Sequence, residues 1–256
     1  YINQRSNINS YKKMSGKVQS GGGSGSGGFD LKKFIAEAVG TSMLTYIACG
    51  GAQVGSAPIA FGFTYIAVAY TIGSISDCHI NPAVSLCMLI KKKMSVCEFF
   101  VYIGAQFLGG FVGSFFLGLC KRGQWGSLYS NYIQYPLINH NNGKKDGWSY
   151  VDALLIEIIL TFIFVFVVQG ATDKKCYEGK HAGIIIGLAL ALVYNFGDAY
   201  TRTSVNPARS LGPALLELID KHDGTNNEAI KEIWIFIIAP LAGGALSGLA
   251  YDAFLG

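Results

Sequence analysis

Charged residues are scarce in this chain, at 14%, and hydrophobic residues make up 51%. The mean hydropathy is +0.36. Soluble globular domains carry about 25% charged residues, and a soluble enzyme with so few charges would be hard to keep in solution. The composition therefore indicates a membrane protein.

Chemically reactive groupings are lacking as well. The six cysteines have no Cys-x-x-Cys spacing, which argues against a disulfide framework and against a metal site. The chain contains nothing that resembles a nucleophile triad, a phosphate-binding loop or a zinc site. We expect no enzyme activity, no cofactor and no metal.

Six stretches with few or no charges are long enough, or nearly long enough, to cross a bilayer, which takes about 20 residues. We expect membrane helices over residues 34–50, 57–75, 99–120, 153–171, 182–196 and 233–251.

The basic residues give an orientation. Twelve of the 20 Lys and Arg residues fall on one side of the membrane, including those of the short loops at 91–93 and 174–180. Because basic residues favour the cytoplasmic side, we expect both termini in the cytoplasm. The net charge of +4 then reflects topology and not a nucleic-acid partner. The lipid bilayer is the expected surrounding, in the plasma membrane or an intracellular vesicle membrane.

The chain divides into a tail and a membrane domain. Residues 1–28 are polar and end in a Gly/Ser run, which predicts a flexible cytoplasmic tail, and no signal peptide is expected. Residues 29–256 form the membrane domain. Its two halves, about 31–120 and 151–253, are joined by an expected extracellular loop over 121–150.

The halves carry matching motifs. Each has a Glu in its first span, Glu37 and Glu157, and each has an Asn-Pro-Ala sequence further along. Since three spans per half is an odd number, the second half must enter the membrane from the opposite side, as an inverted repeat. The two motifs comprise Asn81, Pro82, Ala83, Asn206, Pro207 and Ala208.

The apolar runs that follow these motifs are too short to span. They predict two re-entrant half-helices, which are tolerated at membrane depth where they line a water-filled cavity. Pro82 and Pro207 suit the first helical turn, and Asn81 and Asn206 suit the cap. The helix N-termini would then meet and place partial positive charge at the centre.

Together these motifs resemble the two pore loops of the aquaporin (major intrinsic protein) family. The resemblance covers residues 31 to about 251 and implies an all-α membrane protein of six transmembrane helices and two re-entrant half-helices. It implies a passive water channel that excludes protons and ions, assembled as a homotetramer. The constriction of the family carries over to Phe61, Tyr194, Thr203 and Arg209.

Tyr194 departs from the family pattern, because water-selective relatives usually place His there and glycerol-conducting ones Gly. If the fifth span is shifted by half a turn, Phe196 would be the wall residue instead. Glycerol channels carry Asp and a basic residue where this chain has Ser210 and Ala214. We therefore expect water to pass and glycerol to be excluded.

Glu37 and Glu157 leave an alternative open. The resemblance implies that they support the re-entrant loops by accepting backbone N–H groups, whereas a pair of buried carboxylates could also relay protons in an ion- or proton-coupled transporter. A closed pore with a structural role is a third hypothesis.

Gating from the cytoplasmic side is also expected. Ser95 directly follows Lys91-Lys92-Lys93-Met94, and Ser15 follows a similar run in the tail, so both suit a basophilic kinase. A phosphate adds about −1.5 to −2 charges. Tyr11, ahead of the Gly/Ser run, could bring the tail back to plug the inner mouth.

Overall fold

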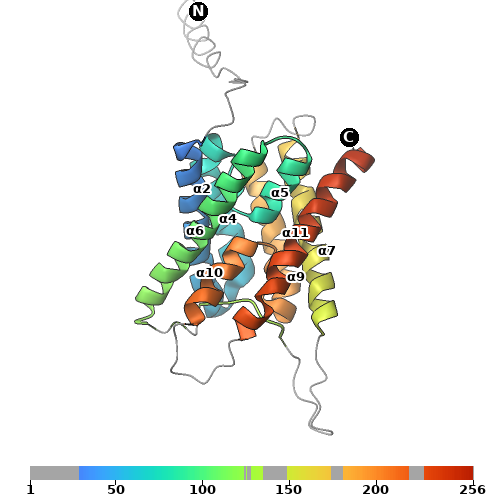
Figure 1. The fold of residues 1–256 in the computed structure, drawn as a ribbon. Helices are drawn as coiled ribbons and strands as arrows, with labels where there is room; N and C mark the ends of the chain where they lie inside the picture. The colour runs from blue at the N-terminus through green and yellow to red at the C-terminus, as the bar shows by residue number, and fades with distance from the viewer. Residues whose placement is uncertain are drawn as a thin grey trace, which may run out of the picture.

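The computed structural model describes residues 29–123, 125, 128–134, 149–173, 181–218 and 228–255, and every regular element in these ranges is helical. The predicted tail, with Tyr11 and Ser15, and the basic loop at 174–180 lie outside the described residues. Helix α2 begins and helix α11 ends at the same end of the molecule (Figure 1).

The first helical stretch, Leu31–Ser76, is long enough to cross a bilayer twice. Its 46 residues would measure about 69 Å as one straight helix. Instead it turns at Val54 and Gly55, whose backbone is not helical; Gly55 has φ of 87°, which glycine adopts without strain. The stretch is built in order from α2 (Leu31–Met43), η1 (Leu44–Ala48), α3 (Cys49–Gly51), η2 (Ala52–Ser56) and α4 (Ala57–Ser76).

Helix α4 packs back against α2, so this stretch supplies two crossings. Four further long helices supply the rest: α6 (Val96–Cys120), α7 (Tyr150–Thr172), α9 (Ala182–Thr201) and α11 (Glu228–Leu255). By length and composition, five continuous helices in the described part of the chain could cross a membrane, the folded first stretch counting as one. The six expected crossings are thus present.

Several helices extend beyond the apolar windows that predicted them. Helix α6 begins at Val96 because Ser95 and Glu98 form a capping box, and α7 begins at Tyr150 because Ser149 and Asp152 form another. Polar caps of this kind lie outside the hydrophobic run, so a hydropathy window places the helix start too late.

Two short helices follow the Asn-Pro-Ala motifs, as expected. Helix α5 (Pro82–Ile90) has 9 residues and α10 (Pro207–Glu217) has 11. In each, the proline occupies the first turn and the asparagine caps the N-terminus. They lie in opposite halves of the molecule and approach its middle from opposite ends (Figure 1).

Each half of the chain packs against the short helix of the other half. Helix α6 packs against α10, and α11 packs against α5. The contacts correspond: a Cβ added at Gly110 would clash with the backbone of Ala208, and one added at Gly244 would clash with the backbone of Ala83. Glycine is required at both positions because a helix backbone passes directly over an Asn-Pro-Ala motif. The inverted repeat therefore interlocks at the motifs.

Candidate functional site

Each of the two motif asparagines forms a hydrogen bond with the loop that precedes the other asparagine. Asn81 Nδ2 donates to the carbonyl of Val205 over 2.7 Å, and Asn206 Nδ2 donates to the carbonyl of Ile80 over 2.8 Å. Their Oδ1 atoms accept from the first backbone N–H groups of α5 and α10. Since a side-chain amide has two N–H groups, each asparagine keeps one further donor, and both side chains line a central cavity.

The loops before the asparagines have an unusual backbone. Positive φ angles occur at Cys78 (53°) and Ile80 (42°), and again at Thr203 (40°) and Val205 (44°). The two pairs lie 125 positions apart, as Asn81 and Asn206 do. β-branched residues rarely adopt this conformation, which costs on the order of 1–3 kcal/mol each. The same strained shape is thus built twice.

Two buried carboxylates hold these loops in shape. Glu37 accepts from the backbone N–H groups of His79 (2.9 Å) and Ile80 (2.6 Å), and Glu157 from those of Ser204 (2.8 Å) and Val205 (2.9 Å). Hydroxyl and amide groups complete each set, from Ser76 and Gln106 to Glu37 and from Thr201 to Glu157. Both carboxylates are fully buried, and neither is among the residues that line the two cavities described in this section.

The central cavity is small, about 10 Å³, which is room for about one water molecule. Beyond the asparagines it is bounded by Phe61, Tyr194 and Arg209. The rings of Phe61 and Tyr194 stack with centroids 3.8 Å apart and planes 13° apart. Arg209 Nε donates to the Tyr194 hydroxyl over 3.0 Å, and its guanidinium carbon lies 5.1 Å from the centre of the Phe61 ring. Three of the four expected constriction residues are therefore in contact.

The fourth, Thr203, does not take part in these contacts. It is buried against Gly197 of α9, and the central cavity is not lined by its side chain. The alternative wall residue Phe196 is 59% exposed on the outer surface of α9, whereas Tyr194 is 1% exposed. The structure thus puts Tyr194, and not Phe196, at the constriction.

Arg209 is fixed by a loop segment that the sequence did not single out. Its Nη1 donates to Asn131 Oδ1 and its Nη2 to the Tyr129 carbonyl over 3.0 Å. Asn131 Nδ2 in turn donates to the carbonyls of Thr201 (2.9 Å) and Arg202 (3.0 Å). These partners of the guanidinium are neutral oxygens, so its positive charge stays available to the cavity.

The Tyr129 side chain anchors the same segment. Its hydroxyl donates to the Asp198 carboxylate, and burial together with that carboxylate raises the pKa of Tyr129 well above the ordinary value. The Arg202 guanidinium lies over the Tyr129 ring at 5.2 Å. The segment is therefore held at Tyr129 as well as at Asn131.

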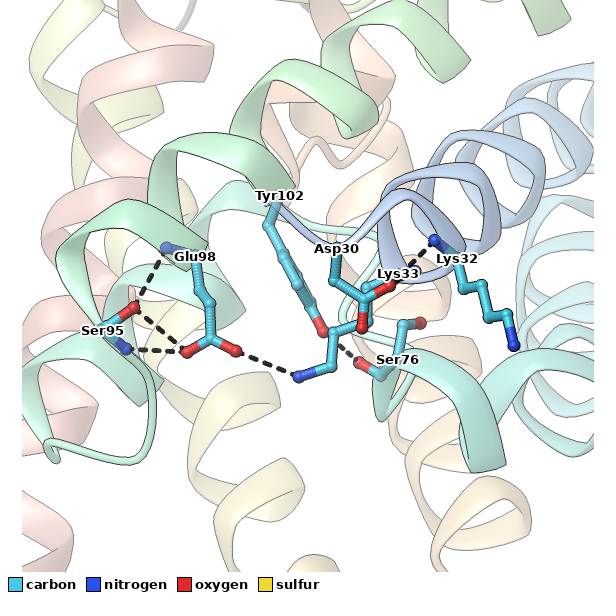
Figure 2. Close-up of polar contacts among 7 residues, drawn as sticks. All are labelled: Asp30, Lys32, Lys33, Ser76, Ser95, Glu98 and Tyr102. Carbon is cyan, nitrogen blue, oxygen red and sulfur yellow. Dashed lines mark hydrogen bonds and ion pairs between the residues drawn. The ribbon is translucent and has the colours of Figure 1, made fainter. Parts of the chain in front are cut away.

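A second cavity, which we call the vestibule, opens at the end of the molecule where α2 begins. It measures about 550 Å³, and Lys33, Asp77, His79, Glu98 and Tyr102 are among its lining residues. Figure 2 shows its rim, where Lys33 Nζ forms an ion pair with Glu98 Oε1 over 3.0 Å.

Ser95, the expected phosphorylation site, is exposed at this rim. Its hydroxyl accepts from the backbone N–H of Glu98 and donates to Glu98 Oε2, both over 3.2 Å (Figure 2). Ser95 is therefore linked through Glu98 to Lys33 on α2.

Two further aromatic residues at the cavities were missed in the sequence. Tyr65 lies one helical turn after Phe61 on α4, and Phe164 lies two turns after Glu157 on α7; both line the central cavity. Helical spacing from Phe61 and Glu157 was the available signal. Asn131 and Tyr129 gave no comparable signal. Within the described ranges, no group of three His, Cys, Asp or Glu residues comes together to bind a metal.

Comparisons with known proteins agree with this geometry. The family model "Major intrinsic protein" matches residues 26–251. Aquaporin Z of Bradyrhizobium diazoefficiens is 35% identical over 234 residues, and Aquaporin Z of Rhodopseudomonas palustris is 36% identical over 234 residues. Each alignment covers 87% of this chain and 92% of the relative.

A solved structure has the same fold. The aquaglyceroporin from Plasmodium falciparum superimposes with a TM-score of 0.75, at 21% identity, over 88% of this chain and 96% of that protein.

Proposed function

This chain belongs to the major intrinsic protein (aquaporin) family, and from that premise we propose that it is a passive water channel that excludes protons, ions and glycerol. Membership makes it an integral, multi-pass membrane channel for water or small solutes and not an enzyme. The strict selectivity is the proposal.

The contact of Phe61, Tyr194 and Arg209 beside a one-water cavity carries this proposal. A cavity with room for about one water molecule suits water in single file. Glycerol has a three-carbon chain, and the constriction offers no apolar wall wide enough to accommodate that chain. Arg209 supplies donors and a positive charge that disfavours cations. Tyr194 keeps the constriction narrow with a phenol, which lies against the guanidinium and stacks on Phe61.

Proton exclusion is proposed to arise at the asparagines. The N-termini of α5 and α10 both point at Asn81 and Asn206, so two partial positive charges meet there. Each asparagine also offers an N–H group to the cavity. A water that accepts from both uses its oxygen twice and cannot pass a proton along a chain.

The burial of Glu37 and Glu157 argues against a coupled transporter. Both carboxylates are committed to backbone N–H groups of the loops and stand away from the cavity linings. We propose structural support as their role. A pore that rests closed is the remaining candidate, and the tight stack of Phe61 on Tyr194 is the observation that favours it.

We further propose that both termini face the cytoplasm and that four chains assemble, each with its own passage. Large apolar side chains such as Phe63, Leu192 and Leu249 are more than half exposed on the outer surface, which suits contact with lipid and with neighbouring chains.

Gating is proposed at Ser95. A phosphate there would repel Glu98, open the capping box and compete for Lys33 at the rim of the vestibule. Water permeability of Ser95→Asp, Ser95→Ala and a chain lacking residues 1–28 should differ from that of the parent at equal protein density. Three rates equal to the parent rate would refute gating at Ser95 and by the tail.

Stopped-flow light scattering on proteoliposomes tests the channel itself, with water and glycerol compared in one preparation. We expect osmotic water flux that is linear in the gradient with a low activation energy, and glycerol flux no higher than in empty liposomes. Glycerol flux well above that control would refute the selectivity. Absent water flux would favour the closed pore, and dependence on a proton gradient would favour the transporter.

A further inference from the structure

Tyr65 is the one residue that lines both the vestibule and the central cavity among the described residues. The vestibule has room for many waters and the central cavity for about one, so the position between them controls access to the asparagines. The Tyr65 side chain, 3% exposed, occupies that position.

Two contacts hold the Tyr65 ring in place. Its hydroxyl donates to the Cys78 carbonyl over 3.0 Å. Its ring meets the edge of the Phe164 ring, with centroids 6.2 Å apart and planes at 86°. Phe164 comes from α7 of the other half, so each half of the chain contributes one aromatic ring to this contact.

The internal repeat shows what a plain pore wall looks like at the corresponding positions. Asn81 and Asn206 are 125 positions apart, and the position 125 after Tyr65 is Leu190, which also lines the central cavity. Likewise, Phe164 follows Glu157 by seven positions, as Leu44 follows Glu37, and Leu44 lines the cavity too. At both places one half has an aliphatic residue where the other has an aromatic ring.

The phenol also changes the hydrogen bonding of the passage. Cys78 has a positive φ and lies in the strained loop before Asn81, and its carbonyl is an acceptor at the passage. The Tyr65 hydroxyl uses one of the two lone pairs of that carbonyl, so a passing water finds less acceptor capacity there.

We propose that Tyr65, with Phe164, forms a second constriction between the vestibule and the asparagines, and that it excludes glycerol independently of the constriction at Phe61, Tyr194 and Arg209. Tyr65 is thus a specificity-determining residue of the channel. This inference rests on the proposed water-channel function.

The test compares four proteins in proteoliposomes: the parent, Tyr65→Val, Tyr194→Gly and the double variant. Each single variant keeps one constriction and should exclude glycerol. The double variant should conduct it, with a permeability about tenfold above that of either single variant, which corresponds to about 1.4 kcal/mol off the barrier. Tyr65→Phe, which keeps the ring and frees the Cys78 carbonyl, should still exclude glycerol when combined with Tyr194→Gly.

Phe63→Val is the matched control, because Phe63 is an aromatic residue on the same helix that is 62% exposed and lines neither cavity. Combined with Tyr194→Gly, it should leave glycerol excluded. If Tyr65→Val does not reconstitute, Tyr65→Leu replaces it, since Leu190 is tolerated at the related position.

Equal glycerol flux in Tyr194→Gly and the double variant would overturn the proposal, and so would a double variant that conducts water but no glycerol. The water and glycerol fluxes of the parent protein distinguish a failure of the proposed water-channel function from a failure of the inner constriction at Tyr65. A parent that conducts glycerol refutes the proposed selectivity. A parent without water flux refutes the open channel. In that case, a gain of water flux in the Tyr65→Val single variant would still support the inner constriction.

Discussion

Replacing Asn131 by leucine should free Arg209 and destabilise the protein. Asn131 is buried; it accepts from Arg209 Nη1 and donates to the carbonyls of Thr201 and Arg202. Leucine has the same branched arrangement of side-chain heavy atoms and can form none of these hydrogen bonds, so the change removes the polar contribution. Ser210, which also donates to Asn131, keeps partners at Ser204 and Asn206.

The magnitude follows from the partners. Loss of a hydrogen bond to a charged group costs about 1.5–3 kcal/mol, and the two bonds to carbonyls contribute about 0.5–1.5 kcal/mol each. The sum is about 2.5–6 kcal/mol. At about 2–4 °C for each kcal/mol in a chain of this size, the melting temperature should fall by about 5–24 °C.

Two assays check this prediction. Thermal unfolding of the detergent-solubilised protein measures the melting temperature, and stopped-flow scattering with a potassium-leak assay measures whether the freed Arg209 still excludes cations. We expect a lower melting temperature and a raised potassium leak. Asn195→Leu is the control, because Asn195 is exposed on α9 and should change neither. If the Asn131→Leu protein has the same melting temperature as the parent and no greater potassium leak, the reasoning is refuted.

Two further changes test the supports of the loops. Glu157→Gln replaces one acceptor oxygen by a donor, so a backbone N–H of Ser204 or Val205 loses its partner; the free energy of unfolding should fall by about 1–3 kcal/mol, and water flux should fall with it. An unchanged melting curve and flux would mean that the carboxylate does not hold the loop. Gly244→Leu would force a side chain into the Ala83 backbone and cost about 1–3 kcal/mol or more, whereas Gly73→Leu, with open space around it, should be tolerated. Equal melting temperatures for these two variants would contradict the close packing of α11 on α5.

The sequence alone determined the family and the fold class. The repeated Asn-Pro-Ala motifs, the paired glutamates and the apolar runs are local patterns, and each has a direct physical meaning at its own position. Six crossings and two half-helices follow from lengths and from the odd number of spans in each half. Helix ends were less well predicted, since the caps at Ser95 and Ser149 lie outside the hydrophobic runs.

The site was only partly predictable. Arg209, Phe61 and Tyr194 came from the family resemblance, and the structure brings them together. The choice between Tyr194 and Phe196 required the rotation of α9, which is set by packing against α4 and α7 and not by hydrophobicity, because both faces of the helix are apolar.

Only the tertiary structure decided which partners complete the site. Asn131 lies 78 positions from Arg209 and belongs to a loop without a motif, so nothing local marks it as the group that fixes the guanidinium. Apart from its helical spacing from Phe61, nothing in the sequence distinguishes Tyr65 from other apolar residues of a membrane helix; its contact with Phe164, 99 positions away, appears only in the folded structure. Motifs can be recognised from neighbouring residues in the sequence. The width of a passage is a distance between helices, and only the tertiary structure sets that distance.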